Sequence, residues 1–103
     1  MEETKKQQSF GYKEREKLSP PPNYHVIIHN DNFTTMDFVV MLLMKVFHKS
    51  EIEATRLMLQ VHNEGRGIAG TYSYDIAQTK ATQGTSLART SGFPLILTVE
   101  PEQ

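Results

Sequence analysis

The chain has 103 residues, and its 38% hydrophobic and 22% charged residues are ordinary for a protein with one modest core. A formal net charge of -1 offers no basic surface, so we expect neither nucleic acid nor a membrane as a partner. Because the sequence contains no cysteine, it excludes a disulfide framework, a thiol nucleophile and a cysteine zinc site.

Residues 1–22 differ in composition from the rest of the chain. Residues 1–19 contain few aliphatic side chains, carry mixed charge and run into three consecutive prolines. Such a segment buries too little apolar surface to offset the entropy of ordering it, and a proline run favours an extended conformation. We therefore expect a disordered extension over residues 1–22 and a folded core over residues 23–103. The start is too polar for a secretory signal, and the longest apolar run, residues 38–44, is too short to span a bilayer.

The core begins with a predicted strand over residues 24–29, which is rich in β-formers and ends at a cluster of turn residues, 30–32. Thr34 or Thr35 is then expected to cap a helix, with Asp37 in its first turn. The apolar residues of this helix recur at helical spacing: Met36, Val39, Val40, Leu43 and Phe47.

A capping box over residues 50–53 predicts the start of a second helix, and Gly65 is a natural stop for it. Its apolar stripe consists of Ala54, Met58 and Val61. Residues 67–72 weakly indicate a second strand. The pattern of this strand predicts that Ile68, Gly70 and Tyr72 lie on one side.

Ser73 is expected to cap a third helix, whose small and apolar residues keep a 3.6-residue period to Ala88. Pro94 precedes a last strand over residues 95–100, in which apolar residues alternate. The predicted order is β-α-α-β-α-β. We therefore predict an α+β fold in which three helices pack on one face of a small sheet.

The sequence shows little sign of enzyme chemistry. It contains no nucleophile elbow, phosphate loop or H-E-x-x-H motif. His25 and His29 resemble a metal-binding pair only if they lie on a helix, because on a strand they are about 13 Å apart. We therefore expect a non-enzymatic protein with no metal and no cofactor.

Polar residues follow the first strand, and a lone histidine lies near the end of the second helix. By pattern alone, Asn30, Asp31 and Asn32 form a turn that leads into a helix cap. His62 follows Met58 by one helical turn and is by pattern a boundary histidine. The alternative is that these groups accept hydrogen bonds from a ligand.

Three segments of the sequence together resemble the ClpS family. Residues 30–40, N-D-N-F-T-T-M-D-F-V-V, are similar to the signature N-D-D-x-T-P-M-x-F-V of that family. Residues 54–62, A-T-R-L-M-L-Q-V-H, form a second block, and residues 75–80, D-I-A-Q-T-K, form a third. The blocks follow one another at the family's spacing, and the resemblance covers about residues 24–100.

The resemblance implies a monomeric adaptor in the bacterial cytoplasm, with a plastid stroma as the alternative compartment. Such adaptors bind N-degrons, which consist of a free α-amino group and a bulky first residue: Leu, Phe, Tyr or Trp. They dock on the N-terminal domain of a ClpA- or ClpC-type AAA+ unfoldase and deliver the substrate for degradation by ClpP. The implied fold is a three-stranded antiparallel sheet against three helices, which agrees with the order predicted above.

The resemblance also assigns roles to residues. It implies that the α-amino group is bound by Asn30, Asp31, Asn32 and His62. It implies a hydrophobic pocket formed by Thr34, Met36, Val39, Met58, Val61 and Leu95, in which Met36 is the gatekeeper that rejects β-branched first residues. It places the unfoldase interface at Asp75 and Lys80, and it likens residues 1–22 to the family's N-terminal extension.

Two positions depart from the family signature. Asn32 stands in place of a second Asp, which removes a negative charge and predicts a weaker hold on the ammonium group. Thr35 replaces a proline at the helix start, which we expect to cost little. The change at Asn32 leaves open a modulator of the unfoldase with a vestigial pocket. Two more hypotheses have less support: a ribosome-associated module with a related fold, and a hydrolase built on Asp31 and His62.

Overall fold

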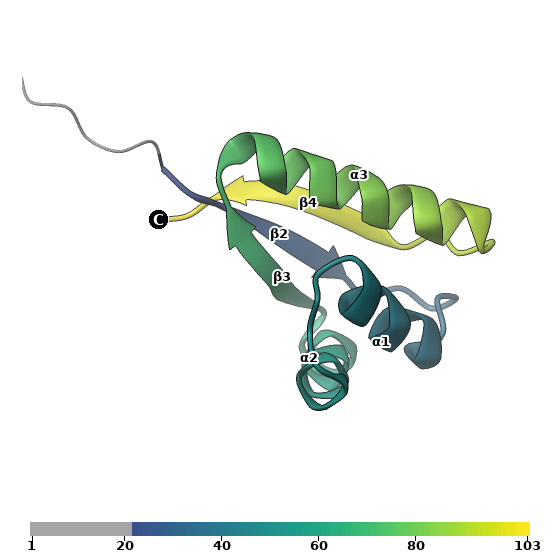
Figure 1. The fold of residues 1–103 in the computed structure, drawn as a ribbon. Coiled ribbons are helices and arrows are strands. Elements are labelled where there is room, and N and C mark those ends of the chain that lie inside the picture. The colour runs from purple at the N-terminus through teal and green to yellow at the C-terminus, as the bar shows by residue number, and fades with distance from the viewer. Residues whose placement is uncertain (1–21) are drawn as a thin grey trace, which may run out of the picture.

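The structure is a computed structural model that describes residues 22–103, so the expected disordered extension lies outside the described residues except for Pro22. The elements follow the predicted order β-α-α-β-α-β, which is confirmed (Figure 1). They are β2 (Tyr24–His29), α1 (Met36–Lys45), α2 (Glu51–Glu64), β3 (Arg66–Tyr72), α3 (Tyr74–Thr90) and β4 (Ile96–Pro101). No helix of the described part is long and apolar enough to cross a membrane.

The three strands form one antiparallel sheet in the order β3-β2-β4. The register with β3 shifts in the middle: Ile27 pairs with Ile68, whereas Val26 pairs with Gly70. Ala69 is therefore an extra residue, and this bulge changes the alternation of β3. Since neighbours on β2 point to opposite faces, Ile68 lies on the face opposite to Gly70. The prediction that these two residues share a side was therefore wrong.

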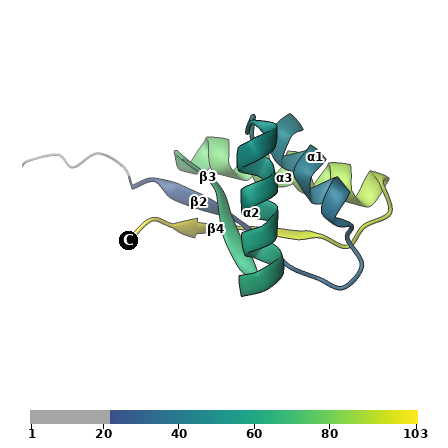
Figure 2. The same cartoon turned by 90° about the horizontal axis from the view of Figure 1, so that it is seen from below.

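The hydrophobic core lies between the sheet and the three helices. Val26 and Ile28 of β2 meet residues of every helix in one cluster, which includes Leu42 of α1, Val61 of α2 and Ala81 of α3. α3 runs along β4 (Figure 1), whereas α2 runs across the strand direction beside β3 (Figure 2). The predicted arrangement of helices on one face of the sheet is confirmed.

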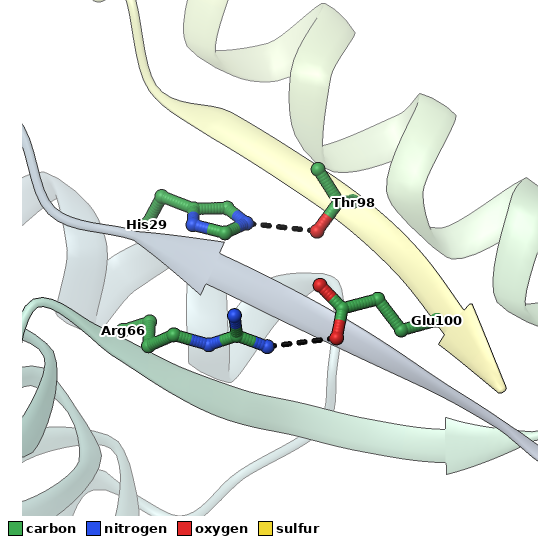
Figure 3. Close-up of polar contacts among 4 residues, drawn as sticks. All are labelled: His29, Arg66, Thr98 and Glu100. Atoms are coloured by element: carbon green, nitrogen blue, oxygen red, sulfur yellow. Dashed lines mark hydrogen bonds and ion pairs between the residues drawn. The ribbon is translucent and has the colours of Figure 1, made fainter. Parts of the chain in front are cut away.

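The opposite face of the sheet carries polar side chains. His25 Nδ1 lies 2.8 Å from Thr71 Oγ1, and His29 Nε2 lies 2.8 Å from Thr98 Oγ1. Arg66 of β3 pairs with Glu100 of β4 at 2.8 Å (Figure 3). The two histidines are thus on a strand, as predicted, and each contacts a different outer strand.

The sequence left two candidates for the N-cap of α1, Thr34 and Thr35. The Thr35 hydroxyl accepts a hydrogen bond from the Phe38 amide at 3.1 Å, so Thr35 caps α1 and Thr34 does not. Ser50 caps α2 in the same way by accepting from the Glu53 amide at 3.2 Å. Both caps satisfy an amide that the helix itself leaves free.

A residue in left-handed backbone lies in the turn after each of these helices, directly after α2 and three residues after the end of α1. Gly65 follows α2 with φ of 95° and its amide donates to Val61 O at 2.9 Å, as expected for a helix stop. His48 follows α1 with φ of 58°, a conformation that disfavours a side chain. The turn at His48 lies between α1 and α2, whereas the turn at Gly65 leads from α2 into β3.

Candidate functional site

A hollow of about 410 Å³ lies where the loop after β2 meets the start of α1 and the end of α2. One side of the hollow is polar and the other is apolar. It is lined by Asn30, Asp31, Asn32, Phe33, Thr34, Thr35, Met36, Val39, Met58, Val61 and His62. The structure thus brings together nine of the ten residues that the resemblance assigned to the ligand site.

A backbone contact explains how distant parts of the chain meet here. The Asn30 amide donates to Gly65 O at 2.8 Å, and the preceding pair, His29 and Arg66, continues the β2–β3 ladder. The end of β2 is therefore tied to the end of α2. His62 lies in the last turn of α2, so this link places its ring beside the turn that begins at Asn30.

Asp31 organises the polar side of the hollow. Its Oδ1 accepts from the Phe33 amide at 2.8 Å and from the Thr34 amide at 2.7 Å. Its Oδ2 accepts from the Thr34 hydroxyl at 2.7 Å. Because a carboxylate oxygen accepts about two hydrogen bonds, Oδ1 is saturated, whereas Oδ2 keeps one site for a ligand. The turn expected from the pattern alone is present, and it leaves part of the carboxylate available.

The charge of Asp31 is stabilised by its surroundings. Partial burial raises the pKa of this carboxyl, but the Thr34 amide and hydroxyl, the Phe33 amide and the positive charge of Arg89 together outweigh that effect. The pKa of Asp31 is therefore below its usual value. The hollow thus holds a fixed negative charge at neutral pH.

The other polar side chains of the hollow have free acceptor atoms. Among the hydrogen bonds between described residues, none involves the side chain of Asn30, Asn32 or His62. All three residues are exposed. Two amide oxygens and an imidazole nitrogen therefore surround the hollow together with Asp31 Oδ2, and such a group of acceptors suits a cation with several N–H donors.

The apolar side of the hollow comes from two helices. Met36 and Val39 lie one turn apart at the start of α1, and Met58 and Val61 lie one turn apart near the end of α2. Met36 is 44% exposed, whereas Val39, Met58 and Val61 are buried, so Met36 forms the rim and the other three the wall. This arrangement suits an apolar side chain that enters past Met36.

Two of the predicted pocket residues have other surroundings. Leu95, immediately before β4, is only 1% exposed in the core and is not among the side chains that line the hollow. The Thr34 hydroxyl lines the hollow but donates to Asp31. Thr34 therefore holds the turn in shape, and Leu95 belongs to the core cluster that also contains the wall residues.

The sequence analysis missed Phe33 and Thr35, which also line the hollow. Phe33 is 76% exposed. It lies between the predicted strand and the predicted helix, so the apolar patterns of those elements gave it no role. A signal was present nonetheless, because a large aromatic residue is unusual within a polar turn.

The residues assigned to a protein interface lie on α3, outside the hollow. Asp75 is exposed in the first turn of α3. Lys80 is half-buried, and its Nζ donates to Val46 O at the end of α1 at 2.8 Å. Lys80 thus satisfies a carbonyl that the helix leaves free and links α3 to α1, which the sequence pattern did not predict.

Known proteins resemble this chain over most of its length. A model of the family described as ATP-dependent Clp protease adaptor protein ClpS matches residues 19–98. The ATP-dependent Clp protease adapter protein ClpS of Myxococcus xanthus is 49% identical over 89 residues, which are 86% of this chain and 83% of that protein. The protein of the same name from Acetivibrio thermocellus is 50% identical over 82 residues, 80% of this chain and 83% of its own length.

A solved structure also resembles the fold. Agrobacterium tumefaciens ClpS2 bound to L-phenylalaninamide matches with a TM-score of 0.78 and 40% sequence identity. The match covers 81% of this chain and 100% of that one. The similarity therefore extends over the sheet, the helices and the loop that forms the hollow.

Proposed function

The chain belongs to the ClpS family of Clp protease adaptor proteins, and from this premise we propose that it binds N-degrons and delivers them to an AAA+ unfoldase. The N-degron is a free α-amino group followed by a bulky apolar first residue: Leu, Phe, Tyr or Trp. Delivery is to a ClpA- or ClpC-type unfoldase in the bacterial cytoplasm, for degradation by ClpP.

The observation that carries the proposal is the two-sided hollow. An N-terminal residue presents an ammonium group next to its own side chain, so its binder needs acceptors beside an apolar cavity. Here Asn30, Asp31, Asn32 and His62 line one side, and Met36, Val39, Met58 and Val61 line the other. The bound phenylalaninamide of the Agrobacterium protein has both features, since it carries a free α-amino group and a benzyl side chain.

The ammonium group is held by charge and by hydrogen bonds. Its three N–H groups donate to the free Oδ2 site of Asp31, to the amide oxygen of Asn30 and to an imidazole nitrogen of His62. Asn32 supplies a further acceptor at the exposed rim. Charge-assisted hydrogen bonds contribute about 1.5–3 kcal/mol each, which makes the free amine the main determinant of affinity.

The first side chain fills the apolar part of the hollow. It passes Met36 at the rim and packs on Val39, Met58 and Val61, while Leu95 belongs to the core cluster that contains these wall residues. A side chain branched at Cβ is widest where it passes the rim, so Met36 rejects Ile and Val by steric clash. This is the gatekeeper role assigned from the sequence.

Delivery uses a separate surface. We assign the contact with the N-terminal domain of the unfoldase to α3, through Asp75 and Lys80, and we assign residues 1–22 to engagement of the unfoldase. This surface shares no residue with the hollow, so substrate and unfoldase can be bound at the same time. The adaptor carries out no catalytic step in this scheme, and needs no cofactor.

Fluorescence anisotropy with short labelled peptides tests the proposal. Free-amine Leu, Phe, Tyr and Trp peptides are compared with Ala and Ile peptides and with N-acetyl-Phe. We expect binding of the first group and its loss on acetylation, because acetylation removes the cation. Equal binding of free and acetylated Phe peptides, or binding of neither, contradicts the proposal.

A second candidate function rests on Asn32. Because this residue lacks the negative charge of the family's second Asp, the chain could instead act as a modulator of the unfoldase with a vestigial pocket. Inhibition of the unfoldase without detectable peptide binding is the result that favours this function.

A further inference from the structure

One face of α2 extends beyond the proposed N-degron pocket. Glu51, Thr55, Met58 and His62 are separated by four, three and four residues, so they form one stripe along the helix. His62 lies at the polar end of the pocket, and Met58 forms part of its wall. The other two residues of the stripe continue away from the pocket toward the start of α2.

A second hollow, of about 580 Å³, lies along that continuation between α1 and α2. α2 contributes Glu51, Thr55 and Met58 to its lining. α1 contributes three apolar residues and, at the two ends of the helix, two charged ones: Val40, Met41, Met44, Asp37 and Lys45. Met58 therefore lines both hollows. The first hollow lies between the start of α1 and the end of α2, and the second extends to the end of α1 and the start of α2. The two hollows are therefore successive parts of one crease between the helices.

The lining of the second hollow is suited to apolar ligands. Met41 and Met44 lie on the same face of α1, and each side chain is 39% exposed to solvent. Exposed apolar groups that gather in a groove indicate a contact surface. Methionine is flexible and polarisable, so it adapts to side chains of different shape.

We propose that this crease, defined by Val40, Met41, Met44, Thr55 and Met58, holds residues 2–5 of the N-degron and favours apolar side chains there. The inference rests on the proposed function, because the amino group anchors the peptide at His62. From His62 to Glu51 α2 rises about 16 Å at 1.5 Å per residue. About five extended residues cover that length at 3.3 Å each, which matches one residue in the pocket and four along the crease.

The test compares ligands that differ only beyond the first residue. Phenylalaninamide fills the pocket alone. The peptide amide Phe-Leu-Ser-Leu-Lys reaches the crease with apolar side chains, and Phe-Gly-Ser-Gly-Lys reaches it without them. We expect the leucine peptide to bind about tenfold more tightly than the glycine peptide, as partial burial of two leucines implies.

Variants then locate the effect. The double substitution Met41→Ser with Met44→Ser should abolish the preference for the leucine peptide and leave phenylalaninamide affinity unchanged. Leu59→Ser is the matched control, because Leu59 is a similarly exposed apolar residue of α2 at 44% and lines neither hollow. The control should keep the full preference. Unchanged phenylalaninamide binding also shows that each variant is folded.

Three results overturn the inference. Equal affinity of the two peptides for the natural protein shows that the protein does not recognise side chains beyond the first residue. A leucine preference that survives in the double variant shows that the substrate leaves the pocket by another route, for example past Phe33. If none of the three ligands binds, phenylalaninamide included, the proposed function itself fails and this inference fails with it.

Discussion

The two halves of the helical layer are packed in different ways. α3 presents small residues to the sheet: Ala77, Ala81, Gly84 and Ala88 are all buried. A Cβ on Gly84 would lie only 2.8 Å from Leu97 Cδ2, so the Leu97 side chain fills the space beside this glycine. The α1–α2 pair instead presents methionine and valine, and it leaves two hollows open between the helices.

This difference in packing predicts that the α3 half contributes mainly to stability and the α1–α2 half mainly to ligand binding. At its interface with the sheet the α3 half has a hollow of about 240 Å³, beside Ala81 and Leu97, which is smaller than the two hollows of the α1–α2 half. Arg89 ties α3 to the following loop by donating to Phe93 O at 2.9 Å and Leu95 O at 2.8 Å. The α1–α2 half keeps free acceptors and exposed methionines. Substitutions in the first half should therefore lower stability, whereas substitutions in the second should change affinity and specificity.

The largest expected effect is on stability and tests the α3 half. Gly84→Leu forces a large side chain into the contact with Leu97, and we expect the free energy of unfolding to fall by about 3 kcal/mol, as overpacking of a tight interface does. Urea denaturation measures the change. Gln83→Leu, at an exposed neighbouring position, is the control and should be close to neutral. An unchanged free energy of unfolding in Gly84→Leu would show that the α3 interface accepts a large side chain and is not tightly packed.

The next effect tests the charge in the hollow. Asp31→Asn keeps an acceptor for the Phe33 and Thr34 amides but removes the negative charge. We expect peptide affinity to fall by about 2 kcal/mol, or roughly 30-fold, in anisotropy titrations. Asp75→Asn makes the same charge change on α3 and should leave peptide affinity unchanged. Equal losses in both variants would indicate that only the overall charge matters.

A specificity change tests the rim. Met36→Ala removes the side chain that rejects branched first residues, so we expect affinity for N-terminal Ile and Val peptides to rise by about tenfold. Met41→Ala removes a similarly exposed methionine of the same helix and should not admit these peptides. Continued rejection of Ile peptides by the first variant would exclude Met36 as the gatekeeper.

A smaller effect tests the departure from the family signature. Asn32→Asp restores a second negative charge at the rim, and we expect tighter binding of Leu and Phe peptides by about 1 kcal/mol, since the rim is exposed to solvent. Asn63→Asp adds the same charge to the end of α2 without lining the hollow and should have less effect. No change or weaker binding on Asn32→Asp would show that the amide is not responsible for a reduced affinity.

The smallest effect is a pH dependence. The pKa of Asp31 is lower in the folded state than its usual value near 3.9, so the folded state binds its proton more weakly than the unfolded state. This contribution to stability is complete above about pH 5 and is lost as the pH falls through the lowered pKa. The unfolding free energies of the natural protein and Asp31→Asn should therefore converge in acid. A constant difference from pH 7 to pH 2 would contradict this.

Local signals predicted most of the fold, whereas the candidate site residues came from the resemblance to the family. Ser50 and Gly65 mark the ends of α2 because a hydroxyl cap and a left-handed glycine act through their own neighbours. The sequence could not place Ile68, since the bulge at Ala69 depends on pairing with β2. Nor could it separate Leu95 from the residues that line the hollow, because that depends on how segments distant in the chain pack in the core.

By itself, the sequence determined the order of the elements, the Ser50 cap of α2 and the family, since these depend on residue types at short spacing. It left Thr34 and Thr35 open as the cap of α1, and Ser73, which was expected to cap α3, makes no side-chain cap hydrogen bond. Only the tertiary structure decided that Asp31 keeps one oxygen site free and that Lys80 binds the end of α1. It also decided that the pocket continues into a crease between α1 and α2, with Met58 in both parts. These features depend on contacts between segments distant in the chain, and packing sets such contacts after local structure has formed.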